Sequence, residues 1–142
     1  MKKTILFSFL AILLCVACSK KDKAQSRTDI ITNGSWSLSA VVSDNDANGS
    51  YETNDFAGFS LCYTDNFYTF RSNAQLELNE GPTKCAPGDP QTELATWSFT
   101  QNETHLMINA DEYVLMELNS SKVIIKEELA GGRSSVITFS KR

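Results

Sequence analysis

The sequence predicts an all-β protein, an antiparallel eight-stranded meander barrel with a lipocalin-like fold. Short runs in which apolar and polar residues alternate recur about every eight to twelve residues, a pattern typical of sandwiches and barrels. Residues that favour tight turns, such as Asn, Asp and Gly, separate these runs. No convincing helix follows the N-terminal segment. The chain has 142 residues, 42% hydrophobic and 21% charged, as expected of one globular domain.

The expected strands alternate between one apolar and one polar face. They lie at residues 35–43, 66–71, 75–79, 94–100, 105–109, 112–118, 122–128 and 134–140. In the first strand, Trp36, Leu38, Ala40 and Val42 are expected on the same face, and one helical turn is expected before it, at residues 29–33. Connections between strands are short and therefore favour antiparallel neighbours. Closing the meander into a barrel removes the exposed edges.

The first residues are typical of a bacterial lipoprotein signal peptide. Lys2 and Lys3 precede an apolar stretch at residues 5–16, which is too short to cross a hydrocarbon core of ~30 Å as a helix. Ala17 before Cys18 resembles the lipobox, in which the cysteine receives acyl chains such as palmitate. We therefore expect residues 1–17 to be a signal peptide and Cys18 to be the lipidation site. An ordinary secretory signal cut nearby is the alternative.

Residues 18–29 are polar and charged without any periodicity, so we expect a flexible tether in front of a barrel domain at residues 30–142. Acyl chains anchor a protein through ~0.8 kcal/mol per buried methylene. The expected location is therefore the cell envelope, as an outer membrane lipoprotein, with the periplasmic or surface face left open. The expected partner is the membrane. Nucleic acid is not expected, because the formal charge is −4.

The cysteine count agrees with export. Cys18 is assigned to the lipid and Cys15 to the signal peptide, which leaves Cys62 and Cys85 as a pair. In an oxidising compartment such a pair is expected to form a disulfide. The bridge would contribute roughly 3 kcal/mol by closing its loop. Two ligands of a metal site are the competing interpretation, but there is no C-x-x-C motif, and the one histidine, His105, lies in a different segment.

Two motifs resemble a known family. The segment N-G-S-W at residues 33–36 looks like the G-x-W opening of lipocalins, in which the Trp closes one end of the barrel. From about residue 36 to 139 the chain resembles the lipocalin-like lipoproteins of Bacteroidetes-type bacteria. The matching motifs are CYTDNFYTF at residues 62–70, GPTKC at 81–85 and TWSF at 96–99. The resemblance implies a lipocalin-like, calycin-like barrel and does not fix the function.

A loop after the first strand, at residues 44–55, matches the twelve-residue calcium-binding template. Asp44, Asp46 and Asn48 fall at positions 1, 3 and 5, Gly49 at the sharp turn, and Ser50, Glu52 and Asp55 at positions 7, 9 and 12. Calcium prefers six to eight oxygen ligands, so the sequence predicts a structural Ca²⁺ site with an affinity near ~10⁻⁴–10⁻³ M. The alternative is a solvated acidic loop in which Asp, Asn and Gly serve turn formation.

Five aromatic residues are candidates to line a cavity: Trp36, Phe70, Trp97, Phe99 and Phe139. Small barrels can be either hollow or packed, and for these residues we favour a packed interior. Four glutamates, at positions 77, 117, 127 and 128, are expected to face outward.

The sequence contains no G-x-S-x-G elbow and no phosphate-binding Gly loop, so we expect no enzyme. The expected protein is a lipid-anchored, non-enzymatic lipoprotein that binds a small apolar ligand. Its alternative is an accessory or interaction domain with a packed barrel and a structural calcium loop. The sequence names neither the ligand nor a protein partner.

Overall fold

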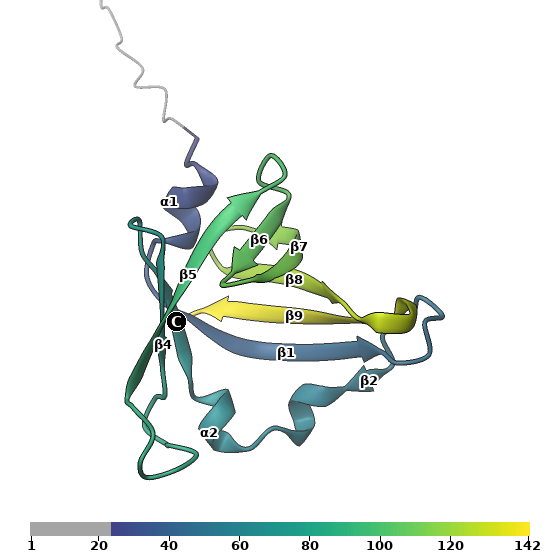
Figure 1. The fold of residues 1–142 in the computed structure, drawn as a ribbon, viewed down its shortest axis with the longest axis horizontal. Helices are drawn as coiled ribbons and strands as arrows, with labels where there is room; N and C mark the ends of the chain where they lie inside the picture. Colours follow the sequence, from purple (N-terminus) through teal and green to yellow (C-terminus); the bar gives the residue numbers. More distant parts are fainter. Residues whose placement is uncertain (1–23) are drawn as a thin grey trace, which may run out of the picture.

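The computed structural model describes residues 24–142, and within them the protein is all-β with nine antiparallel strands in one sheet (Figure 1). The expected signal peptide, Cys18 and the first part of the expected tether lie outside the described residues. The strands are β1 (Trp36–Asp44), β2 (Thr53–Asn54), β3 (Phe67–Phe70), β4 (Gln75–Asn79), β5 (Thr92–Thr100), β6 (His105–Ile108), β7 (Asp111–Leu118), β8 (Lys122–Glu128) and β9 (Ser134–Lys141). The short helices are α1 (Arg27–Ile31), η1 (Asp55–Gly58), α2 (Leu61–Thr64) and η2 (Ala130–Gly132). No helix within residues 24–142 has the length and apolar character that spanning a membrane requires.

The sheet closes on itself. Strands β3 to β9 follow one another as a meander, and β1 pairs with β9 along its whole length, from Trp36↔Lys141 to Asp44↔Ser134. At the other edge of β1, Trp36↔Tyr68 and Ser37↔Phe67 join it to β3. This ring contains the eight expected strands, and β2 is a short addition. The all-β, antiparallel, barrel-like prediction is confirmed.

The junction between β1 and β3 extends over only the first residues of β1. Further along, the same edge of β1 pairs with β2 through Val42↔Asn54 and Ser43↔Thr53. Residues 55–65, which contain η1 and α2, then connect β2 back to β3 across this side of the molecule (Figure 1). We call residues 55–65 the portal segment. Helical turns therefore replace strand pairing on one side of the barrel.

A bulge at Ser39 reverses the expected inward and outward positions in the second half of β1. Leu38 pairs with Phe139 and Ala40 with Thr138, so Ser39 has no opposite residue. An extra residue moves the following side chains to the other face. Ala40 and Val42 were expected beside Trp36, but Val41 and the buried Ser43 face inward instead.

One end of the barrel is closed by large side chains and by α1. The indole nitrogen of the fully buried Trp36 donates a hydrogen bond of 2.8 Å to the carbonyl of Ile31, which is also fully buried. Helix α1 is capped by Ser26, whose hydroxyl accepts from the Asp29 N–H at 3.0 Å. The helix begins two residues before the expected turn, so the last residues of the expected tether are helical. The buried core comprises Ile31, Trp36, Phe70, Leu76, Trp97, Leu106, Leu115, Val123 and Ile125.

Candidate functional site

The other half of the barrel contains a cavity of about 390 Å³. Its walls come from seven strands and from the portal segment. Eight lining residues are apolar: Leu38, Val41, Phe59, Leu76, Ile108, Ile125, Ile137 and Phe139. Four are polar or charged: Tyr68, Tyr113, Glu127 and Ser135. The cavity is therefore mainly apolar with a few polar groups, which is the usual composition of a small-molecule site.

Some inward positions in this half hold smaller side chains than those of the closed end. The closed end is filled by Trp36, Phe70 and Trp97, which are all buried. Along the neighbouring strands, the inward positions nearer the open end hold residues such as Val41 and Ile137, which pair across β1 and β9. Aliphatic side chains at these positions leave space that indole rings would fill.

A second hollow of about 320 Å³ adjoins the cavity beneath the portal segment. Leu38, Phe59 and Tyr68 line both spaces, and Tyr63 and Asn66 complete the second. Phe59 remains 41% exposed although it lines both hollows. Its ring therefore lies between the cavity and the solvent.

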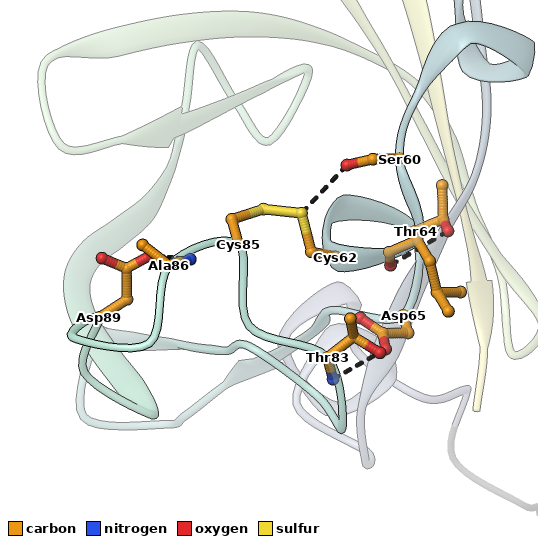
Figure 2. Close-up of a disulfide and its surroundings, with 9 residues drawn as sticks. Ser60, Cys62, Thr64, Asp65, Thr83, Cys85, Ala86 and Asp89 are labelled. Atoms are coloured by element: carbon orange, nitrogen blue, oxygen red, sulfur yellow. Dashed lines mark hydrogen bonds between the residues drawn. A yellow bond between two sulfur atoms is a disulfide. The ribbon is translucent and has the colours of Figure 1, made fainter.

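The portal segment is held in place by the Cys62–Cys85 disulfide, which confirms the expected pair. Figure 2 shows that this bridge joins α2 to the loop between β4 and β5. In the same place the Thr83 N–H donates a hydrogen bond of 3.1 Å to the Asp65 carboxylate. The bridge and this hydrogen bond fix the segment that covers the side of the cavity.

Aromatic contacts order the outer face of the portal segment. The Phe59 ring meets Phe56 edge-on at 6.2 Å between centroids and Tyr63 at 6.4 Å. Leu61 and Tyr63 are 64% and 56% exposed. These edge-to-face pairs restrain Phe59, the one residue of the group that also lines the cavity.

Two tyrosines bring hydroxyl groups to the cavity. Burial raises the pKa of Tyr113, and the nearby carboxylates of Glu127 and Asp111 raise it further. Burial also raises the pKa of Tyr68, with a smaller effect from the Glu80 carboxylate. Both phenols are therefore protonated at neutral pH and can donate hydrogen bonds.

Glu127 lies on the inner face of β8, contrary to the expectation that it faces outward. It follows Val123 and Ile125, which are both buried, at intervals of two residues. The alternation within residues 122–128 already contained this information, because residues two apart in a strand share a face. The residue type, rather than the spacing, suggested the outward position.

The structure separates the five aromatic residues that were expected to line a cavity. Phe139 lines it, whereas Trp36, Phe70 and Trp97 belong to the buried core of the closed end. Phe99 packs edge-on against Trp97, with 5.4 Å between the ring centroids. The sequence shows which residues face inward but not how far along the barrel axis each one lies.

The first half of the calcium-like loop is compact. The carboxylate of Asp44, which is 4% exposed, accepts hydrogen bonds from the N–H groups of Asn48 at 3.1 Å and Gly49 at 2.9 Å. Burial alone would raise the pKa of Asp44, but hydrogen bonds with Gly49, Asn48, Asp46 and Ala47 together hold the pKa below its usual value. The Asn48 amide donates to Asp46 at 3.0 Å, and its oxygen accepts from the Ser50 N–H at 2.7 Å.

The residues in the second half of the loop do not join Asp44, Asp46 and Asn48. Glu52 is exposed, and Asp55 begins η1, where its carboxylate accepts a hydrogen bond from the Ser43 hydroxyl. Across residues 24–142, no three His, Cys, Asp or Glu side chains are grouped closely enough to hold a metal ion. The loop thus gathers Asp44, Asp46 and Asn48 but not Glu52 and Asp55, and calcium binding remains a prediction.

No family model and no curated protein matches this sequence. Among solved structures, the chain is similar to a DUF4847 family protein from Bacteroides vulgatus ATCC 8482. The TM-score is 0.55 at 11% sequence identity, and the match covers 82% of this chain and 98% of that chain. At this identity the similarity shows the fold alone, an antiparallel all-β arrangement of barrel-like form.

Proposed function

We propose that the protein is a lipid-anchored lipoprotein of the cell envelope, in the outer membrane, whose lipocalin-like barrel binds a small apolar ligand without catalysis. The observation that supports binding is the cavity of about 390 Å³ between the closed end and the portal segment. This volume lies in the range of small-molecule sites, roughly 300–1,000 Å³. The site has an apolar wall and a few oriented polar groups, so it suits a ligand with an apolar body.

The lipocalin-like assignment is supported by the position of Trp36. The resemblance implies a Trp that closes one end of the barrel, and Trp36 is fully buried there. The ammonium group of Lys141 lies 4.6 Å from the centre of the Trp36 ring, which adds a cation–π contact. The lipid anchor is supported by the sequence around Cys18.

Binding can be tested with N-phenyl-1-naphthylamine, a neutral probe that fluoresces in apolar surroundings. The full chain would carry Cys18→Ala, so that no attached acyl chains compete for the probe. We expect saturable binding that Ile137→Trp weakens, because an indole at this lining position takes up part of the cavity. The matched control is Met116→Trp, which adds the same ring at a position that is 55% exposed on β7. Equal binding by both variants would contradict the proposal.

An interaction domain is the second candidate, and one observation favours it. Leu61 and Tyr63 are mostly exposed beside Phe59 on the portal segment. Exposed apolar groups that gather in one place often contact a partner. Two results together would support this candidate over ligand binding. The chain would bind no probe, and changing Leu61 and Tyr63 to Ser would abolish binding of a protein partner.

A further inference from the structure

The residues that line the cavity include one carboxyl group and no lysine, arginine or histidine. Glu127 on β8 is the charged residue among those that line it. Tyr113 of β7 and Ser135 of β9 line the same cavity, and Ser135 lies opposite Glu127 in the sheet register. The nearest lysine in sequence, Lys126, lies on the other face of β8 and pairs with Glu128 at 2.8 Å.

Within residues 24–142, Glu127 forms no ion pair, and no lysine, arginine or histidine lines the cavity beside it. Glu127 is only partly buried, and a ligand that displaces water from the cavity would remove more of its hydration. This loss is costly unless an opposite charge or several hydrogen bonds replace the water. Ser135 is neutral, and its hydroxyl is engaged in a hydrogen bond of 2.8 Å with Ser43. A cationic ligand would provide the missing partner.

The aromatic rings that line the cavity also favour a cationic ligand. Tyr68, Tyr113, Phe59 and Phe139 all line it, and Tyr68 meets Phe139 edge-on at 5.0 Å. Aromatic faces attract an organic cation, most strongly where water is excluded. A carboxylate ligand would be disfavoured. Its negative charge would be repelled by Glu127, and no lysine or arginine among the lining residues would offset this repulsion.

We propose that the cavity binds a small organic cation, an amphipathic amine whose protonated nitrogen contacts Glu127 while its apolar body lies among Ile108, Ile125 and Ile137. This inference rests on the proposed function and specifies its ligand class. The cavity of about 390 Å³ favours a short or compact amine over a long lipid.

The test compares three probes that share one apolar chain and differ in head group: octylamine, 1-octanol and octanoate. Each displaces N-phenyl-1-naphthylamine from the full Cys18→Ala chain at pH 7. We expect octylamine to bind about tenfold more tightly than 1-octanol, since charge-assisted hydrogen bonds are roughly twice as strong as neutral ones. Octanoate should bind most weakly.

Glu127→Gln keeps the shape of the side chain and removes its charge. We expect this variant to bind octylamine about tenfold more weakly, with 1-octanol unchanged. The matched control is Glu128→Gln, which removes a charge from the outer face of the same strand and should leave the order of the three probes as in the wild type. Ile137→Trp should weaken binding of all three, which separates cavity binding from attraction to the acidic surface.

The two proposals fail in different ways. If the neutral probe binds but octylamine shows no advantage over 1-octanol, the amine inference is wrong and ligand binding stands. The comparison of the three probes on the chain with Glu127 in place is sufficient for this conclusion, even if Glu127→Gln does not fold. If the neutral probe does not bind, calorimetry with octylamine alone is decisive: absence of binding overturns both proposals, and binding that Glu127→Gln removes supports the amine inference.

Discussion

At the scale of single residues, Ser39 and Glu127 both shape the cavity. The bulge at Ser39 turns Val41 rather than Ala40 and Val42 toward the interior. Glu127 contributes an acid where its neighbours on the same face, Val123 and Ile125, are apolar. Each feature depends on one position in a strand. The inward position of Glu127 can be recognised from alternation, whereas the bulge at Ser39 cannot. A bulge inserts a residue without a clear signature in the local pattern.

A first prediction concerns Asp44, whose pKa is lowered by hydrogen bonds from Gly49 and Asn48. A carboxyl group with a lowered pKa in the folded state stabilises the protein above its ordinary pKa of ~3.9 and loses this contribution as the pH falls through the folded-state value. Asp44→Asn should therefore lower Tm at pH 7, and the difference from the wild type should shrink below about pH 4. Thermal unfolding followed by circular dichroism between pH 3 and 7 measures this. A difference that does not change with pH would contradict the assignment.

At the scale of elements, the portal segment is the least regular part of the wall. Strand pairing between β1 and β3 covers two residue pairs, and the disulfide compensates by fixing α2 to the loop between β4 and β5 (Figure 2). The sequence predicted the disulfide because two cysteines remained after export and lipidation were assigned. It did not predict η1 and α2, since helices this short depend on the contacts that surround them.

The second prediction tests this bridge. Replacing Cys62 and Cys85 by Ser should reduce the free energy of unfolding by roughly 3 kcal/mol, because the unfolded chain gains the entropy of an open loop. Denaturant unfolding of the two forms gives the difference. Reductant should destabilise the wild type to a similar extent and leave the double variant unchanged. A wild type that is insensitive to reductant would show that the bridge does not contribute.

The calcium loop provides the third prediction. If Asp44, Asp46 and Asn48 begin a calcium site, millimolar calcium should raise the Tm of the wild type, because an ion that binds only the folded state stabilises it. The rise should disappear in Asp46→Ala and persist in Asp111→Ala, which removes an exposed carboxylate from β7. Thermal scans with calcium and with chelator measure the effect. No shift in the wild type would leave the loop as a structure held by its own hydrogen bonds.

At the scale of the whole molecule, the barrel is filled at one end and hollow at the other. The filled end contains Trp36 and Ile31, the last residue of α1, and Phe59 of the portal segment lines the cavity. The polar segment that precedes α1 thus joins the domain at its filled end. In a lipid-anchored protein, the hollow half would be free to meet a ligand.

The fourth prediction concerns the anchor. Cys18→Ala should move the protein from the membrane fraction to the soluble part of the envelope, because the acyl chains that hold it are absent. Cell fractionation followed by immunoblotting measures the partition. Cys15→Ala is the matched control and should leave the protein with the membrane. Unchanged partition of Cys18→Ala would show that something other than a lipid on this residue anchors the chain.

The sequence by itself determined the strands, their antiparallel order and the cysteine pair. Alternation and turn residues act over a few positions, so they can be recognised without knowing the rest of the fold. The tertiary structure alone decided that Trp36, Phe70 and Trp97 fill one end while the other stays hollow. Cavity volume depends on side chains from many strands that meet at one level of the barrel, and that level is set by register and by the bulge at Ser39.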